Sequence, residues 1–187
     1  MNQSWMQAVT TAQVAGATLA SSNTNTTILP TSALFTFPAN FFTFIGQKWR
    51  VRAYGQMSNI VTTPGTITFN FQFGAVVVCT SGALQMNAVA KTNVSWNLEM
   101  TGTVRALGSG TSTNNIYFGT FQSESYVSSP VPGTGGSGGV VFPTSAPAVS
   151  AGWDCTVTQQ ANLFAQFSVN NAGNAITLMD YVLEATN

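Results

Sequence analysis

TITFNFQFG, residues 66–74, alternates strictly between apolar and polar side chains. Successive side chains of a β-strand point to opposite faces of the sheet, so one face of this stretch is wholly apolar. The apolar face carries Ile67, Phe69, Phe71 and Phe73, and the opposite face carries Thr68, Asn70 and Gln72. The pattern predicts a half-buried strand that turns one face to a hydrophobic core.

The same alternation recurs in two later stretches. VSWNLEMTGTVRA (residues 94–106) and NLFAQFSV (162–169) each place apolar residues at every second position. AVVVCT (75–80) is a shorter apolar run, and turn sequences such as TTPGT separate the strands without any long helical period. We therefore predict an all-β domain over residues 31–187, an antiparallel β-sandwich of jelly-roll-like form.

The last predicted strand changes phase. Ile176 and Leu178 follow one alternation, whereas Met179, Tyr181 and Leu183 follow the other. Either a β-bulge or burial of both faces of the strand would explain the change.

Ionised side chains are scarce. Only 5% of the 187 residues are Asp, Glu, Lys or Arg, there is no histidine and the formal net charge is zero, while 44% of the residues are apolar. The apolar content is sufficient for a core, and a neutral surface resists association poorly. We expect a surface covered by partner proteins or by copies of the same chain; an extracellular β domain with a Ser/Thr-rich coat is the alternative.

Residues 1–30 contain no charged side chain and are predicted to form an extended N-terminal arm. Four apolar residues in it, Trp5, Met6, Val9 and Val14, are compatible with a short helix and are the candidate contacts with another protein surface. An unattached terminus is the alternative. Without Lys or Arg, the arm is not expected to bind phosphate groups of a nucleic acid.

KWRVRAYGQ, residues 48–56, holds three of the five cations in the chain. In a strand, Lys48, Arg50 and Arg52 share the outer face, because Trp49 and Val51 are suited to the core. Glu99 also faces outward and would oppose an arginine if the two strands pair. An exposed ladder of ion pairs is the main interpretation; contact with a neighbouring subunit and binding of an anionic ligand are the others. The neutral chain argues against nucleic acid as a partner.

Few residues suggest catalysis, and we expect no enzymatic activity and no cofactor. Histidine, the usual general base and metal ligand, is absent. The five carboxylates, Glu99, Glu124, Asp154, Asp180 and Glu184, form no recognisable pair for glycoside hydrolysis. Asp154 precedes a strand and suits turn hydrogen bonds. The two cysteines, Cys79 and Cys155, form at most one disulfide or act as small buried side chains. We predict no metal site.

Two further features concern ligands. Exposed aromatic side chains stack on sugar rings, and the candidates are Tyr54, Tyr117, Tyr126 and Trp153, although burial in the core or at an interface is the favoured interpretation. Residues 130–147, rich in Gly and Pro, are expected to form a surface loop. They lack the GxxxxGK[ST] pattern of a phosphate-binding loop.

No membrane association is expected. The N-terminus lacks a basic region followed by an apolar run, and no segment approaches the roughly 20 continuous apolar residues that span a bilayer.

Six stretches together resemble virion proteins of tailed bacteriophages. They are ILP…FTFPANFF (28–42), GQKWRVRAYG (46–55), TTPGTITFNFQFG (62–74), VSWNLEMTGTVRALG (94–108), WDCT (153–156) and ITLMDYVLE (176–184). The resemblance implies a β-sandwich that decorates or cements a phage capsid and is located in the virion. Its expected partners are the major capsid protein and copies of itself, with a trimer favoured. The alternative is a receptor- or glycan-binding module of a fibre or tail tip.

Overall fold

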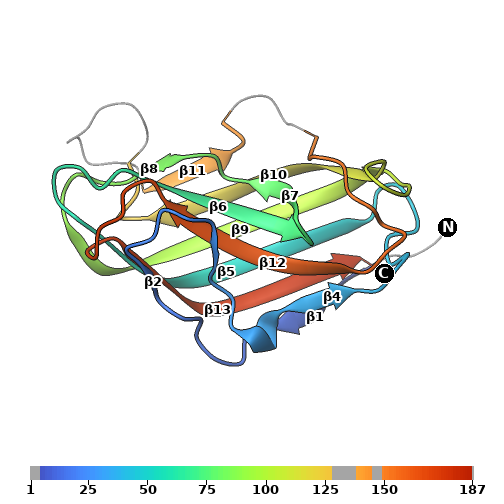
Figure 1. Ribbon diagram of the computed structural model, residues 1–187, viewed down its shortest axis with the longest axis horizontal. Helices are drawn as coiled ribbons and strands as arrows, with labels where there is room; N and C mark the ends of the chain where they lie inside the picture. The colour runs from blue at the N-terminus through green and yellow to red at the C-terminus, as the bar shows by residue number, and fades with distance from the viewer. Residues whose placement is uncertain (1–4, 128–137, 145–148, 187) are drawn as a thin grey trace.

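The computed structural model describes residues 5–127, 138–144 and 149–186, which form two antiparallel β-sheets packed face to face (Figure 1). Sheet A is seven-stranded and contains β1 (Met6–Thr11), β13 (Ala175–Thr186), β5 (Lys48–Asn59), β9 (Lys91–Ala106), β10 (Asn114–Ser123) and β11 (Gly139–Phe142) in that order, with β2 (Leu19–Ala20) also paired to β13. Sheet B is six-stranded and contains β3 (Thr26–Thr27), β12 (Gln159–Phe167), β6 (Thr66–Phe73) and β7 (Val76–Thr80), with β4 (Phe35–Phe37) on β12 and β8 (Leu84–Gln85) on β6. The predicted all-β sandwich is confirmed. One 3₁₀ turn, η1 (Thr31–Ala33), is the only helical element in these ranges.

One strand pair in sheet A corresponds to one strand pair in sheet B. β5 pairs with β13 in sheet A, and the next long strand, β6, pairs with β12 in sheet B. Two of the passages of the chain between the sheets, from β5 to β6 and from β12 to β13, therefore follow the same route in opposite directions. This wrapped pairing is the jelly-roll-like feature of the sandwich.

Aromatic side chains from both sheets meet in the core. The four apolar residues of TITFNFQFG are buried, as their alternation predicts. The Phe71 ring lies 4.9 Å from the Trp49 ring across the sandwich, and the Phe69 ring lies 5.7 Å from that of Trp96. The core thus joins β6 of sheet B to β5 and β9 of sheet A, the strands on which the charged and polar outer face is built.

Two cross-strand pairs of tryptophan and glycine fix β5 against β9. Trp49 pairs with Gly102, and Gly55 pairs with Trp96. A Cβ atom on Gly102 would lie inside van der Waals contact with the Trp49 indole, and one on Gly55 would collide with the Trp96 indole. Each tryptophan therefore needs a glycine on the neighbouring strand.

The N-terminal segment is extended, and it is attached to the sandwich. β1 pairs with the end of β13, from Met6 opposite Thr186 to Thr11 opposite Val182, so a strand stands where a short helix was considered. Leu19, Ile28 and Leu29 further along are buried. The segment satisfies backbone groups that the edge of sheet A would otherwise leave unpaired.

Part of the Gly/Pro-rich region is also a strand. Gly139–Phe142 form β11, which pairs with β10, and Phe142 is buried in the core. Residues 128–137 and 145–148, on which most of the predicted surface loop falls, lie outside the described residues.

We expect Gly102→Ala to lower the free energy of unfolding by about 1–3 kcal/mol, because the added methyl group overpacks the Trp49 site. Thr103→Val, on the outer face of the same strand, serves as the control and changes it by about 0.5 kcal/mol or less. Urea denaturation measures both. Equal stability of Gly102→Ala and the wild type would contradict the close packing of this pair.

Candidate ligand-binding face

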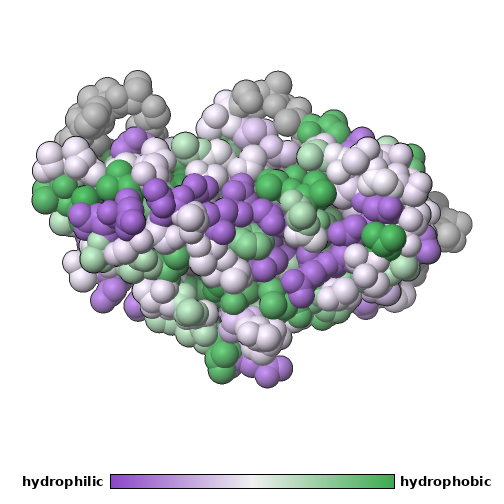
Figure 2. Space-filling view, in the orientation of Figure 1, coloured by the Kyte–Doolittle hydropathy of each residue, from purple (hydrophilic) through white to green (hydrophobic). Residues whose placement is uncertain are grey.

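The charged residues are confined almost entirely to sheet A. Eight of the ten Lys, Arg, Asp and Glu residues lie in strands β5, β9 and β13, Glu124 directly follows β10, and Asp154 lies in the loop before β12. The strands of sheet B contain none of these four residue types. In Figure 2, hydrophilic residues cross the middle of the molecule, where Figure 1 places β6 and β12. On these two strands the polar side chains are amides and hydroxyls.

Strand register arranges the outer face of sheet A in rows that cross the strands. Tyr54 of β5 lies opposite Asp180 of β13 on one side and Asn97 of β9 on the other, and Asn97 lies opposite Gln122 of β10. Neighbouring strands are about 4.8 Å apart, so this row spans about 14 Å. It brings an aromatic ring, a carboxylate and two amides from four strands onto one line.

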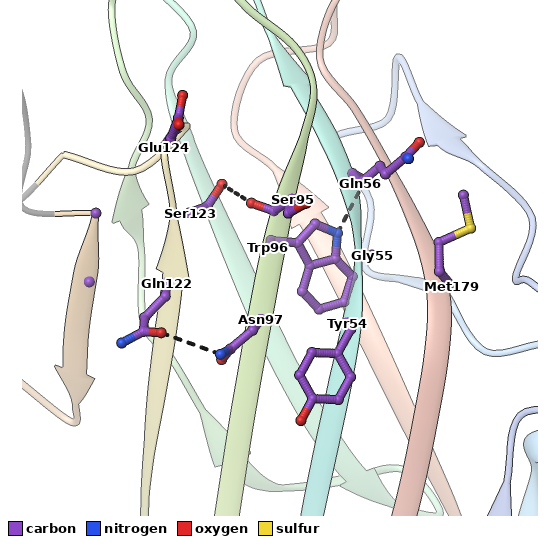
Figure 3. Close-up of a pocket in the computed structure, with 12 residues that line it drawn as sticks. Tyr54, Gly55, Gln56, Ser95, Trp96, Asn97, Gln122, Ser123, Glu124 and Met179 are labelled. Carbon is purple, nitrogen blue, oxygen red and sulfur yellow. Dashed lines mark hydrogen bonds between the residues drawn. The ribbon is translucent and has the colours of Figure 1, made fainter.

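A hollow of about 690 Å³ lies along this row (Figure 3). Its lining comprises Tyr54, Gly55, Gln56, Ser95, Trp96, Asn97, Gln122, Ser123, Glu124, Gly138, Gly139 and Met179. Its volume lies within the range of about 300–1,000 Å³ that is usual for small-molecule sites. We take it as the candidate functional site of the described part of the chain.

Small residues and backbone form much of the floor. Trp96 is buried beside Gly55 and donates a hydrogen bond from Nε1 to the Gln56 carbonyl oxygen at 3.1 Å. Ser123 donates from Oγ to the Ser95 carbonyl oxygen at 3.0 Å. These bonds tie β5, β9 and β10 together under the hollow, so its base is rigidly supported.

A β-bulge supplies one wall. The pairing of β13 with β5 shifts between Leu178 and Asp180, which leaves Met179 as the extra residue. Of the two explanations for the change of phase in the sequence, a bulge or burial of both faces, the structure has the bulge. Tyr181 and Leu183 are buried, whereas Met179, which shares their alternation in the sequence, is 47% exposed. An extra residue reverses the alternation, and here it turns the thioether outward into the lining of the hollow.

The polar groups of the hollow form a defined arrangement of hydrogen-bond donors and acceptors. Asn97 donates from Nδ2 to Gln122 Oε1 at 3.3 Å (Figure 3). No hydrogen bond among the described residues involves the side-chain oxygen Oδ1 of Asn97, the amino group Nε2 of Gln122 or the Tyr54 hydroxyl. The row therefore presents an acceptor, a donor and a hydroxyl beside a 42% exposed aromatic ring.

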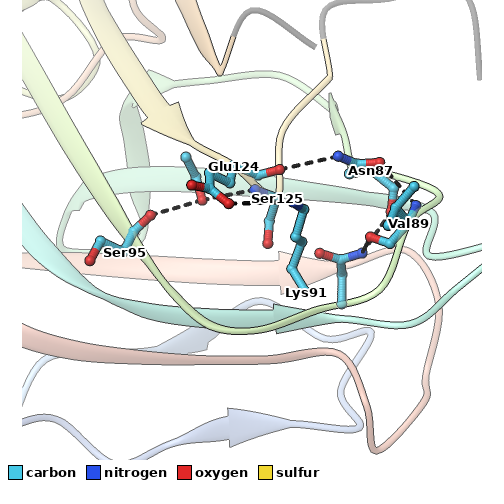
Figure 4. A network of polar contacts seen from close by, with 8 residues as sticks. Asn87, Val89, Lys91, Ser95, Glu124 and Ser125 are labelled. Carbon is cyan, nitrogen blue, oxygen red and sulfur yellow. Dashed lines mark hydrogen bonds and ion pairs between the residues drawn. The ribbon is translucent and has the colours of Figure 1, made fainter. Parts of the chain in front are cut away.

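An ion pair at the edge of the hollow is held by a polar network. Lys91 Nζ lies 3.3 Å from Glu124 Oε2 (Figure 4). Asn87 donates from Nδ2 to the Glu124 carbonyl oxygen at 3.2 Å, and its own backbone carbonyl accepts a bond from Asn59 Nδ2 at 2.6 Å. The backbone that carries Glu124 is thereby fixed to the loop before β9 and, through Asn87, to the end of β5.

The residues predicted to form a charged ladder lie on the outer face, but their ion pairs use a different carboxylate. Lys48, Arg50 and Arg52 lie on the outer face of β5, and Arg52 is opposite Glu99 in the pairing of β5 with β9. The ion pairs, however, join Arg50 and Arg52 to Glu184 of β13, at 2.6 Å and 3.1 Å. The hydrogen bond from Arg50, followed by the charges of both guanidinium groups, lowers the pKa of Glu184 despite its partial burial.

The other residues singled out in the sequence are dispersed. Trp5 and Val14 are exposed, whereas Met6 and Val9 are half-buried along β1. Of the four candidate sugar-binding aromatics, Tyr117, Tyr126 and Trp153 are buried and only Tyr54 faces the solvent. The sequence did not single out Gln56, Asn97, Gln122 or Met179. Their positions depend on strand register, and only the phase change at Met179 was visible in the sequence.

The surroundings of the remaining ionisable groups that the sequence singled out, Asp154 and the two cysteines, indicate structural roles. Asp154 accepts hydrogen bonds from the Gly110 and Thr156 backbone N–H groups and the Thr156 hydroxyl, which lower its pKa and confirm its expected turn role. Cys79 and Cys155 are free thiols, both buried. Within the described ranges, no three Asp, Glu, His or Cys residues gather as metal ligands would. No helix in those ranges has the length and apolar character to span a membrane.

Comparison with known proteins gives weak structural similarities. No family model matches the chain, and no curated protein matches it. The fold is similar to the CBM2 module of the evolved Dit protein of Lactobacillus casei BL23 phage J-1, with a TM-score of 0.30 and 10% identity over 81% of this chain and 67% of that one. It is also similar to a protein of unknown function from Shewanella oneidensis MR-1, with a TM-score of 0.33 and 11% identity over 97% and 78% of the two chains. At these TM-scores neither similarity bears on function.

We expect Glu184→Gln to lower the free energy of unfolding at neutral pH by about 1 kcal/mol, because it removes the carboxylate that pairs with Arg50 and Arg52. Folding lowers the pKa of Glu184, so its stabilising contribution is present above the ordinary value of 4.5 and is lost as the pH falls through the lowered value. The difference between variant and wild type should therefore shrink below pH 4.5.

Urea denaturation at a series of pH values tests this expectation. Glu99→Gln removes a carboxylate from the same face for which the described residues show no ion pair, and is the matched control. A stability difference for Glu184→Gln that is the same at neutral and acid pH would contradict the assignment.

Proposed function

We propose that the protein is a non-enzymatic binding module that takes a neutral glycan on the outer face of sheet A, as a receptor-binding part of a phage fibre or tail tip. The observation that carries the proposal is the hollow along Tyr54, Asn97 and Gln122. The sequence resemblance to virion proteins of tailed bacteriophages supports the location in a phage particle.

The chemistry of the hollow suits an uncharged, hydroxyl-rich ligand. A sugar ring has an apolar face that packs on an aromatic ring, and hydroxyl groups that both donate and accept hydrogen bonds. Tyr54 and Met179 offer apolar surface, while Asn97 and Gln122 offer an acceptor and a donor side by side. Among the described residues of the lining, Glu124 is the only charged one, and it is already paired with Lys91.

The same lining supports binding in preference to hydrolysis. Glycoside hydrolases generally use two carboxyl groups on either side of the scissile bond. Glu124, whose side chain is 73% exposed, is the single carboxylate among the described residues that line the hollow, so this lining offers no pair of carboxyl groups.

We expect Tyr54→Ala to weaken glycan binding about tenfold, because the loss of an aromatic contact costs up to about 1.5 kcal/mol. Tyr54→Phe should retain most of the affinity, since the ring remains. Phe118→Ala removes another exposed aromatic from the outer face of sheet A, beyond the hollow, and should bind normally. A glycan array followed by calorimetry measures these effects. Absence of binding to every neutral glycan would overturn the proposal.

A second candidate function is capsid decoration, in which the protein cements a shell by contacts with the major capsid protein and with copies of itself. The specific observation is the surface: sheet B carries no Asp, Glu, Lys or Arg in its strands, and twelve large apolar side chains are exposed among the described residues. Such a surface can pack against protein with little desolvation of charge. A trimer on the shell would multiply many weak contacts.

Substitution tests this candidate better than truncation, because removing the N-terminal segment would also unpair β13. We expect Trp5→Ser combined with Val14→Ser to lower occupancy on undecorated phage particles about tenfold, since an exposed tryptophan is a frequent anchor at interfaces. Val89→Ser, at an exposed valine beside the opposite end of β5, is the control. Mass spectrometry of the particles gives the occupancy. Unchanged occupancy would show that the N-terminal segment does not dock on the particle.

A further inference from the structure

A second hollow, of about 460 Å³, lies beyond the end of the first. Ser58, Ile60, Val61, Lys91, Thr92 and Ala172 are among the residues that line it. They come from the ends of β5 and β9 and from the turn before β13. The second hollow is therefore built on two of the strands that carry the first.

The two hollows follow one another along β5. Gln56 lines the first and Ser58 lines the second, and both face outward two residues apart, a distance of about 7 Å along a strand. Ser58 Oγ accepts a hydrogen bond from the Asn93 backbone N–H at 3.0 Å, which holds β9 beside β5 at this point.

The ion pair between Lys91 and Glu124 joins the two hollows. Glu124 lines the first and Lys91 lines the second, and their charged ends are 3.3 Å apart (Figure 4). Each charge is compensated by the other, so neither hollow presents an unpaired ionised group from its lining. Both hollows consequently favour the same kind of uncharged ligand.

The second hollow combines hydroxyl and aliphatic groups as a sugar-binding surface does. Ser58 and Thr92 carry hydroxyls, while Ile60, Val61 and Ala172 offer aliphatic surface, with Val61 62% exposed. It has no aromatic ring, so we expect it to add to the affinity of a ligand already held at Tyr54 and not to bind a single sugar strongly by itself.

We infer that the glycan is an extended neutral chain that lies along β5 and occupies both hollows, and that the second hollow is a subsite for further sugar units. The inference rests on the proposed function of the first hollow. On this inference the protein recognises internal sugar units of a polysaccharide chain and not a single terminal sugar. Affinity should accordingly increase with the length of the chain until both hollows are filled.

Length series of chito- and malto-oligosaccharides, from one to six sugar units, test the inference by calorimetry. We expect at least one series to bind, with the longest member at least tenfold tighter than the shortest member that binds. Ala172→Trp and Val61→Trp each fill the second hollow from an exposed position, and should abolish the gain with length while leaving the affinity for the shortest ligand unchanged. Tyr54→Ala should weaken binding at every length.

The outcomes separate this inference from the proposed function. Binding that is independent of length, or a gain with length that survives both tryptophan substitutions, would overturn the second subsite while the first hollow keeps its role. Failure of both series and of every neutral glycan on the array would overturn both. Thermal melting of each variant shows whether it is folded. If one of the two tryptophan variants does not fold, the other one provides the test of the second subsite.

Discussion

The packing of two tryptophans against two glycines between β5 and β9 sets the register on which the outer face of sheet A depends. Trp49 occupies the space left by Gly102, and Trp96 the space beside Gly55. A slip of one residue between these strands would bring each indole against a side chain and would exchange their inner and outer faces. With this register fixed, Tyr54 must lie opposite Asn97. The binding face is thus a consequence of how the core is packed.

The distribution of charge differs between the two faces of the sandwich. Arg50 and Arg52 form ion pairs with Glu184, and Lys91 forms one with Glu124, so ion pairs lie on both sides of the hollow. Neutral amides and hydroxyls gain little from ionic ligands but form directional hydrogen bonds with uncharged ones. The absence of charge from the strands of sheet B lowers the desolvation cost of covering that face with protein.

Local patterns predicted the parts of the fold that depend on near neighbours in sequence. The alternation in residues 66–74 and 94–106 identified β6 and β9 and their buried faces, because a two-residue period is a local property. The row of Tyr54, Asn97 and Gln122 was not predictable, since it depends on pairing between distant segments. Strand β1 was not predicted for the same reason. Its partner β13 is at the other end of the chain, and its own residues lack a clear apolar face.

The N-terminal segment, expected to contact another protein, also supports the bulge that shapes the hollow. On the side of β13 away from β5, β1 covers the end of the strand and β2 covers its beginning, which leaves the bulged part between them. The backbone N–H groups of Ala12 and Gly16 donate hydrogen bonds to the carbonyl oxygens of Tyr181 and Leu178, both at 2.9 Å, on either side of Met179. A Cβ on Gly16 would collide with the Ile28 carbonyl oxygen, so this approach needs a glycine. An irregular strand with unpaired backbone would be mobile, whereas here it is held from both sides. The wall formed by Met179 therefore depends on residues from the opposite end of the chain.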